Sequence, residues 1–417
     1  MKPGGTLSAV IEWGGERGRR ALAWIALASV GLLVAAIVYL RASPTSPPAA
    51  QPVRRAASSQ QAGTPVFFSV RFGDARHGAV QVFSQRNPPP IYLTSDGGRT
   101  WRPLAKTPVP IAAVTYVDGQ RMLAEEFGSG LQRLLGSDDG GRTWRPLAID
   151  PRQSSVTGSW PVLLGSYGWW LDWQPKSGPS PQPSPPVRLW RTVDGGRIWA
   201  PATPSGIPPF DSIDQVRFMD QRHGLLAMTS DDQRRAMVLA TSDGGDTWQT
   251  AAELDSPPAD MHALGVLLLQ HGARLMAWSA FSAWDVRTGG PLPLESPAVT
   301  TFVSVSDDGG GTWGPMQAGP VSTLSYGAAA VVDDSGRLLL LVGHRLWLSD
   351  DDGASWVARV AVLPSGMVPV FMSAAVPGSI YTVAVRSSGA ARIGNQPAAL
   401  LHSSDRGIHW TEVHLPG

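Results

Sequence analysis

Short apolar runs alternate with Gly- and Asp-rich polar stretches along most of the chain. Residues 237–240, for example, are apolar, residues 241–247 are polar and rich in Gly and Asp, and Trp248 follows. Runs of this length bounded by Gly and Asp are typical of β-strands joined by tight turns. The pattern therefore predicts an all-β chain built from hairpins.

One polar stretch repeats. The pattern Ser/Thr-x-Asp-x-Gly-x-Thr-Trp begins at Thr94 and returns six more times at intervals of about 50 residues, which indicates a repeat architecture. Its aspartates are Asp96, Asp139, Asp194, Asp243, Asp308, Asp351 and Asp405. Its tryptophans are Trp101, Trp144, Trp199, Trp248, Trp313, Trp356 and Trp410. Gly-Gly pairs in five copies supply the positive φ that a tight turn needs.

A second, shorter turn signal precedes each copy, as in Phe72-Gly73-Asp74 and Phe218-Met219-Asp220. Each unit is then strand a, turn, strand b, loop, strand c, motif and strand d, which is the four-stranded antiparallel blade of a propeller. We predict a seven-bladed β-propeller over residues 65–417. Its a–b and c–d turns share one face, and its b–c loops lie on the other.

The motif resembles the Asp-box, or bacterial neuraminidase repeat, of sialidases, sortilin-like receptors, polysaccharide hydrolases and photosystem II assembly factors. The resemblance implies a structural role for the motif residues, at a blade edge away from the substrate face. Ile198 and His409 replace the motif Thr, so we expect weaker bonding in those two turns. The overall pattern is most similar to the photosystem II assembly and stability factor family. That family implies a membrane-protein partner bound at an Arg-rich surface.

The N-terminal part has a different composition. Residues 21–40 are uncharged and long enough to cross a bilayer, and Arg17, Arg19 and Arg20 precede them. We predict a cytoplasmic segment at 1–20, a transmembrane signal-anchor helix at 21–40 and a Pro-, Ser- and Ala-rich linker at 41–64. The propeller would then lie in the periplasm or outside the cell. A cleaved signal peptide is the alternative.

Charge and cysteine content exclude several function classes. The chain has no Cys, so disulfides and thiolate metal sites are excluded. Residues 65–417 carry 27 basic and 31 acidic residues, a net charge of about −4, which argues against nucleic acid as a partner. No His and carboxylate cluster with metal-ligand spacing occurs, so we expect no metal, no cofactor and no catalytic residue.

Long b–c loops in blades 3 and 5 flank blade 4, and these loops together with blade 4 supply the candidate binding residues. These are Trp173, Arg188, Arg234, Arg235, Trp284, Asp285 and Arg287. Aromatic and Arg side chains are common anchors of protein interfaces. We therefore expect a non-catalytic binding or assembly scaffold for a protein partner, with another membrane protein as one candidate.

A glycan-binding or glycoside-hydrolase propeller is the alternative function. Two carboxylates are enough for glycoside hydrolysis, and Glu125 and Glu126 with Asp172 or Asp285 are available. A sialidase is disfavoured because the Arg-Ile-Pro signature is missing from the sequence.

Overall fold

The computed structural model describes residues 67–83, 90–105, 107, 109–126, 134–147, 157–158, 161–173, 187–255, 261–283, 298–320, 322–323, 328–333, 335–342, 345–376, 379–386 and 398–416. The predicted cytoplasmic segment, anchor helix and linker at residues 1–64 lie outside these ranges. Within the ranges the regular elements are all strands. In this described part, no helix is long and apolar enough to cross a membrane.

The first four sheets follow one another along the chain. Blade 1 is β1 (Phe67–Phe72), β2 (Gly78–Phe83), β3 (Ile91–Thr94) and β4 (Arg102–Pro103). Blade 2 is β5 (Ile111–Tyr116), β6 (Met122–Glu126), β7 (Leu134–Ser137) and β8 (Arg145–Pro146). Blade 3 is β10 (Val162–Leu164), β11 (Tyr167–Trp173), β12 (Arg188–Thr192) and β13 (Ala200–Ala202), with β9 (Thr157–Gly158) paired to β11. Blade 4 is β14 (Phe210–Phe218), β15 (Gly224–Ser230), β16 (Arg235–Thr241) and β17 (Gln249–Asp255).

The other three sheets have the same strand order. Blade 5 is β18 (His262–His271), β19 (Arg274–Ser282), β20 (Ala298–Ser306) and β21 (Gln317–Ala318), with β22 (Ser322–Thr323) paired to β20. Blade 6 is β23 (Ala328–Val332), β24 (Leu338–Val342), β25 (Arg345–Ser349) and β26 (Val357–Val360). Blade 7 is β27 (Met367–Val376), β28 (Ser379–Arg386), β29 (Ala398–Ser403) and β30 (Thr411–Glu412).

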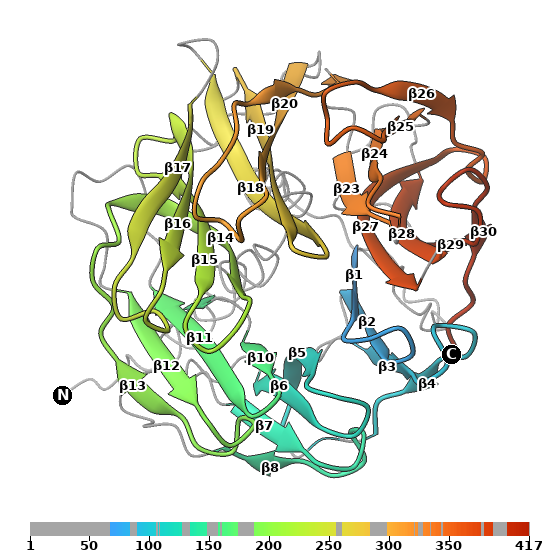
Figure 1. Ribbon diagram of the computed structural model, residues 1–417. Helices are drawn as coiled ribbons and strands as arrows, with labels where there is room; N and C mark the ends of the chain where they lie inside the picture. The colour runs from blue at the N-terminus through green and yellow to red at the C-terminus, as the bar shows by residue number, and fades with distance from the viewer. Residues whose placement is uncertain are drawn as a thin grey trace, which may run out of the picture.

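The seven sheets form a ring (Figure 1), which confirms the predicted all-β, seven-bladed propeller. Every described sheet pairs only strands of one continuous chain segment, so no strand of one blade is shared with another. Blades 7 and 1 are joined by side chains: the Tyr381 hydroxyl donates a hydrogen bond to the Gly97 carbonyl at 2.8 Å. Tyr381 also contacts the rings of Phe72 and Trp101.

The a–b and c–d turns lie together, as predicted. In blade 1 the Gly97 N–H donates to the Arg76 carbonyl at 2.9 Å, and in blade 3 the Gly195 N–H donates to the Ser166 carbonyl at 2.7 Å. We call the side with these turns the turn face, and the side with the b–c loops the loop face.

Buried apolar side chains form seven clusters in the described part of the chain, one between each pair of neighbouring blades. Each motif tryptophan contacts the cluster between its own blade and the preceding blade. Trp248 of blade 4, for example, packs with Leu189 of blade 3 and Phe218. The motif Trp is therefore part of the contact between blades as well as of its own turn.

The c–d turn of blade 4 shows how the motif works. The Asp243 carboxylate accepts hydrogen bonds from the Thr241 hydroxyl (2.8 Å), the Thr247 N–H (2.9 Å) and the Thr247 hydroxyl (2.6 Å). The Trp248 indole N–H donates to the Gly245 carbonyl at 3.0 Å. Partial burial opposes ionisation of Asp243, but these hydrogen bonds outweigh it and lower its pKa to about 2.

The two departures from the motif differ in their effect. The turn of blade 3 keeps the bond from the Ile198 N–H to Asp194 at 3.0 Å, but Ile198 has no hydroxyl to donate, so the expected weakening is found. In blade 7, His409 Nδ1 lies 2.5 Å from Asp405 Oδ2 and takes the place of the missing hydroxyl. The expectation of a weaker turn at His409 was therefore wrong.

Two turns adopt the same backbone without a Gly-Gly pair. In blades 6 and 7, Asp352 and Arg406 occupy the first glycine position, both with φ of 59°. Side chains other than Gly adopt this left-handed region at a cost. The surrounding turn therefore holds these two residues in it.

Candidate functional site

The b–c turn of blade 4 is the part of the loop face that the structure describes most fully. It runs from Ser230 to Arg235 between β15 and β16. The Ser230 hydroxyl donates to Asp232 Oδ1 at 2.5 Å and accepts the Arg235 N–H at 2.9 Å. The Arg234 N–H donates to Asp232 Oδ1 at 2.9 Å. One hydroxyl and one carboxylate thus fix the backbone of the whole turn.

Gln233 connects this turn to β14 and to blade 5. Its φ is 58°, in the left-handed region, and its side chain is buried. Its side-chain Nε2 donates to Asp211 of β14 at 2.6 Å, and its backbone carbonyl accepts the Ala263 N–H of blade 5 at 2.7 Å. A strained residue persists only where its surroundings over-determine it. The turn is therefore preorganised by contacts with two neighbouring elements.

Charged side chains of this b–c turn reach solvent. Asp231, Asp232 and Arg234 are exposed. Arg235 Nη1 lies 3.3 Å from Glu253 Oε2 of β17, with both side chains about half exposed. Partial burial opposes the ionisation of Asp232, but the Ser230 and Arg234 hydrogen bonds and the Arg235 charge lower its pKa. The turn presents both signs of charge on a fixed backbone.

Beneath the turn, a buried carboxyl connects blades 4 and 5. Asp214 lies at a β-bulge of β14, where its side chain is turned towards the next blade. It accepts hydrogen bonds from the Ser212 hydroxyl (2.7 Å), the Thr229 hydroxyl (3.2 Å) and the Val266 N–H (2.9 Å). Burial raises its pKa to about 7 against these bonds and with the help of Asp211. All of its described contacts are structural.

Glu125 was one of the carboxylates considered for glycoside hydrolysis. Its side chain is 5% exposed, and burial raises its pKa to about 8 in spite of the nearby Arg71 charge. Burial also lowers the pKa of Arg71 to about 10, so the guanidinium stays charged at neutral pH. A raised carboxyl pKa suits a general acid, but a substrate needs access to the group.

The structure places the predicted binding residues in different environments. Trp173 is 4% exposed and packs in the cluster between blades 3 and 4, so it serves the core and offers no anchor to a partner. Arg188 is the first residue of β12, and its backbone lies opposite that of Asp172 in β11. Arg234 and Arg235 lie together in the blade 4 turn. Trp284, Asp285 and Arg287 lie outside the described residues.

Sequence reasoning missed Gln233, Asp211 and Asp214. None of them belongs to a repeated pattern, and their roles depend on contacts with blade 5 or with a neighbouring strand. The two β-bulges of β14, which place Asp211 and Asp214, have no sequence marker such as Gly.

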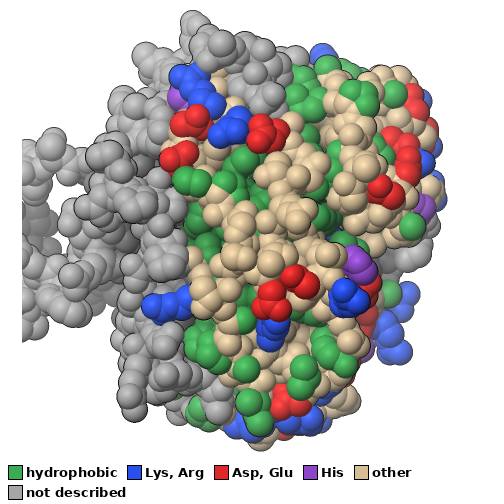
Figure 2. All heavy atoms as spheres, turned by 60° about the vertical axis from the view of Figure 1, so that its left-hand side comes forward, with side chains coloured by type: hydrophobic (Ala, Val, Ile, Leu, Met, Phe, Trp, Pro, Cys, Tyr) green, Lys and Arg blue, Asp and Glu red, His purple; other side chains and the backbone are tan. Residues whose placement is uncertain are grey.

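Figure 2 shows the side of the molecule on which β13 and β17 lie in Figure 1. Acidic and basic side chains form small mixed groups there, separated by hydrophobic and neutral ones. The visible described surface has no broad positive area of the kind that phosphate backbones require. Across the described residues, no group of three or more His, Asp or Glu side chains is arranged to hold a metal ion.

No protein-family model and no curated protein matches the chain. Among solved structures, it is similar to YCF48 from Cyanidioschyzon merolae, with 15% identity, a TM-score of 0.52, and coverage of 82% of this chain and 96% of that one. YCF48 bound to D1 peptide gives 18% identity, a TM-score of 0.47, and coverage of 74% and 83%. The GH74 enzyme of Niastella koreensis gives 16% identity and a TM-score of 0.31, with coverage of 80% of this chain and 61% of that one. At 15% identity, the likeness to the Cyanidioschyzon merolae structure shows the fold alone.

Proposed function

We propose that this chain is a membrane-anchored, extracytoplasmic propeller that acts as a non-catalytic protein-binding or assembly scaffold. Its seven c–d turns would be Asp-boxes that stiffen the ring, and the loop face of blades 3 to 5 would hold the partner. The observation that carries the proposal is the blade 4 turn, where Gln233 fixes a set of exposed charges on a preorganised backbone. Preorganisation lowers the entropic cost of binding.

The proposed location depends on residues 21–40. This uncharged stretch follows Arg17, Arg19 and Arg20, which favours an N-terminus in the cytoplasm. Two measurements on cells test it: alkaline extraction of membranes, which an integral protein resists, and protease added to spheroplasts, which should degrade the propeller. A fully soluble, shorter product would indicate a cleaved signal peptide instead.

Affinity capture from mildly solubilised membranes tests the scaffold function. The wild-type protein should retain a membrane-protein partner that the Trp284→Ala/Arg235→Ala double variant loses, with the melting temperature unchanged. Glu253→Ala is the matched control, because it removes the ion-pair partner of Arg235 and keeps the arginine. Equal capture by all three proteins would exclude this surface.

A glycoside hydrolase is the second candidate, since the raised pKa of Glu125 is a property of general acids. Hydrolysis of a panel of aryl glycosides and plant polysaccharides by the wild type, and its loss in Glu125→Gln, would support it. The burial of Glu125 leads us to expect no turnover and only a stability change in the variant.

A further inference from the structure

In the described part of the chain, the outermost strand of each blade pairs on one side only. The other edge of such a strand presents N–H and C=O groups with which a further strand can pair. Four of the seven outermost strands, β4, β8, β21 and β30, have only two residues, and β13 has three. Short edge strands are one way in which proteins prevent unwanted pairing. β17 and β26 are longer, with seven and four residues.

β17 and β26 differ in the regularity of their pairing. β17 contains a register shift against β16, between Val238 and Leu239. A bulge of this kind increases the local twist and protects an edge from pairing. β26 pairs with β25 in one continuous register from Val357 to Val360, and it contains no Pro. Among the described outermost strands with more than three residues, β26 is therefore the one whose edge is regular throughout.

All four side chains of β26 are exposed. Val357 is 49% exposed and Val360 is 74% exposed. Val357 and Arg359 are two residues apart and project from one face of the strand, whereas Ala358 and Val360 project from the other. An added strand would therefore meet an aliphatic side chain on each face. Exposed apolar groups beside polar ones commonly mark interaction sites.

Contacts with two neighbouring segments hold this edge in place. β25 pairs with all four residues of β26. Directly after β26, Ala361 is buried in the cluster between blades 6 and 7. The Val362 N–H donates to the Ile408 carbonyl of blade 7 at 2.7 Å, and the Trp410 N–H donates to the Val362 carbonyl at 3.1 Å. The edge is thus preorganised, which lowers the entropic cost of pairing with a partner.

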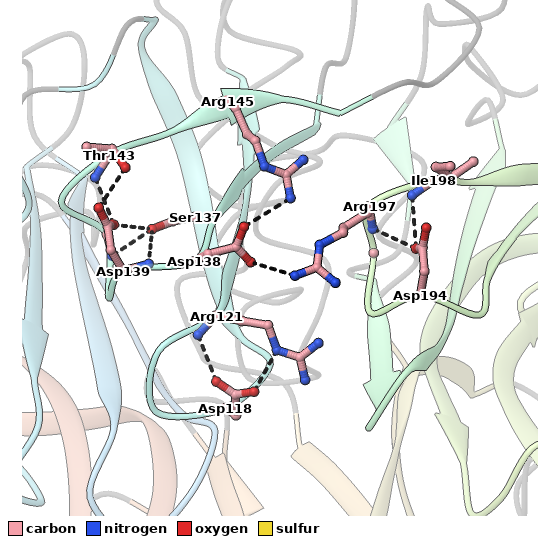
Figure 3. A network of polar contacts seen from close by, with 12 residues as sticks. Asp118, Arg121, Ser137, Asp138, Asp139, Thr143, Arg145, Asp194, Arg197 and Ile198 are labelled. Atoms are coloured by element: carbon pink, nitrogen blue, oxygen red, sulfur yellow. Dashed lines mark hydrogen bonds and ion pairs between the residues drawn. The ribbon is translucent and has the colours of Figure 1, made fainter.

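Arg359 carries the charge of β26. On the β25 side it lies opposite Leu346, which is buried. In the described part of the chain, its guanidinium forms no hydrogen bond and no ion pair. In blades 2 and 3, by contrast, Arg145 and Arg197 lie 3.2 and 3.6 Å from Asp138 (Figure 3). The Arg359 guanidinium is therefore available to a carboxylate on an adjoining strand.

The acidic residues around β26 do not pair with Arg359. Those of the c–d turns of blades 6 and 7 have contacts of their own: Asp350 with Arg337, Asp351 with Ser355, Asp352 with Arg274 and Asp405 with His409. Glu412 of β30 is exposed, and among the described residues it forms no ion pair with Arg359. A carboxylate from a partner would give this guanidinium its first ion pair.

We propose that the outer edge of β26 binds an extended segment of a partner protein as an antiparallel fifth strand of blade 6. Antiparallel pairing continues the arrangement of β25 and β26. The segment would place a carboxylate opposite Arg359 and aliphatic side chains opposite Val357, Ala358 and Val360. Read along the segment, the pattern is aliphatic, acidic, aliphatic, aliphatic. Backbone hydrogen bonds give an added strand its affinity, and the side chains give it selectivity.

This site goes beyond the proposed function. β26 lies at the outer rim of blade 6 (Figure 1), whereas the proposed scaffold surface is the loop face of blades 3 to 5. A strand at the rim could therefore bind whether or not the loop face holds a partner.

Fluorescence anisotropy with labelled peptides tests the site on the full-length protein. The probe is Ser-Thr-Val-Glu-Val-Val-Thr-Ser. One reference peptide has Lys in place of Glu, and the other has N-methyl groups on its four central amides, which then cannot donate to β26. The wild type should bind the probe at least about threefold more tightly than the Lys peptide and at least about tenfold more tightly than the N-methylated one.

Two variants separate the charge from the apolar contacts. Arg359→Glu should reverse the preference, so that the Lys peptide binds more tightly than the probe, with the melting temperature unchanged. Val357→Thr/Val360→Thr should weaken binding of the probe by about threefold or more and keep the strand, since Thr is also β-branched. Val193→Thr, at a Val of blade 3 that is 71% exposed, is the matched control and should bind as the wild type does.

Amide hydrogen exchange locates the contact. Binding of the probe should slow exchange at the amides of residues 357–360 that point away from β25, because these would become hydrogen-bonded. The Trp284→Ala/Arg235→Ala variant should bind the probe as the wild type does, since it changes the loop face and leaves β26 intact.

Several results would overturn the proposal. Equal affinity for the N-methylated peptide would mean that backbone pairing is not used. An unchanged order of affinities in Arg359→Glu would mean that Arg359 does not recognise the carboxylate. No binding by the wild type, or unchanged exchange at residues 357–360, would exclude this edge. A wild-type dimer in sedimentation runs that protects the same amides would assign the edge to a second copy instead.

Discussion

The c–d turn of blade 4 and the b–c turn of the same blade use one local device on opposite faces. In the first, the Thr241 hydroxyl bonds to Asp243 two residues on and accepts an N–H four residues on. In the second, Ser230 bonds to Asp232 two residues on and accepts an N–H five residues on. The same Ser/Thr-x-Asp chemistry thus closes a repeated turn on one face and a unique turn on the other.

The difference lies in what completes each turn. A Gly-Gly pair and the motif Trp complete the c–d turn from within the repeat. The b–c turn has Gln233 in the left-handed region and depends on Asp211 and Ala263, which lie elsewhere in the fold. A turn that is completed locally can be repeated seven times. A turn completed by its neighbours is specific to one place, as a binding site requires.

The largest effect should come from the motif tryptophan. Trp248→Ala should lower the free energy of unfolding by about 3 to 5 kcal/mol, because a side chain only 2% exposed leaves a cavity between blades 3 and 4. Trp144 is half-buried, so Trp144→Ala should cost clearly less. Urea unfolding monitors both. Equal losses would show that the turn, not the contact between blades, needs the indole.

The second effect concerns the buried Asp214 carboxyl, which connects blades 4 and 5 beneath the b–c turn, and it depends on pH. The folded pKa of Asp214, about 7, exceeds its ordinary 3.8, so between these values the folded chain holds a proton that the unfolded chain has released. Stability should therefore fall as pH rises from about 4 to 7, by about 1 kcal/mol per pH unit from this group. Asp214→Asn should flatten that decline in melting temperature.

Asp243→Asn is the contrasting variant for the same series. The folded pKa of Asp243, about 2, is below its ordinary value, so its ionised carboxylate stabilises the fold above pH 4. This stabilisation is lost as pH falls towards 2. Asp243→Asn should leave the slope between pH 4 and 7 as in the wild type. If Asp214→Asn also kept that slope, Asp214 would be ionised in the folded protein at acidic pH.

The third effect compares the Asp243 carboxylate of the c–d turn with the Asp232 carboxylate of the b–c turn. Asp243→Asn should cost about 1 to 2 kcal/mol, because an amide cannot accept at both positions that face Thr247. Asp232→Asn should cost less, about 0.5 to 1 kcal/mol, since this exposed carboxylate accepts its hydrogen bonds from the Ser230 hydroxyl and the Arg234 N–H, whereas Asp243 accepts three. Partner capture should be weakened by Asp232→Asn alone. A binding loss in Asp243→Asn would contradict the assignment of the faces.

The smallest effect concerns left-handed backbone. Arg406→Gly should raise the free energy of unfolding by at most about 0.5 kcal/mol, because Gly, the residue at this turn position in five other blades, bears no strain there but the change also removes the guanidinium 3.8 Å from the buried Asp333 carboxylate. Gln233→Gly relieves similar strain but removes the bond to Asp211, so it should give no gain. Chemical denaturation measures both. A gain at Gln233 would mean that the Asp211 bond contributes little.

The sequence was sufficient for the ring and insufficient for the site, for a physical reason. Strand order and turn chemistry follow from contacts within a repeat, such as Thr247 with Asp243, which recur and are visible as a pattern. The interaction of Asp214 with Val266 joins residues far apart in the sequence and occurs once. Trp173 was misjudged for the same reason: only the packing of blade 4 against β11 shows that it is buried.

In the residues that the structure describes, the ring closes between blades 7 and 1 without a shared strand, through Tyr381, Gly97 and an apolar cluster. This contact is an intramolecular association of blades 7 and 1, and the blades between them keep these two at a high effective concentration. Opening it would break side-chain contacts and leave every sheet paired. Blades can therefore form one after another along the chain, and closure of the ring can wait until the last of them has folded.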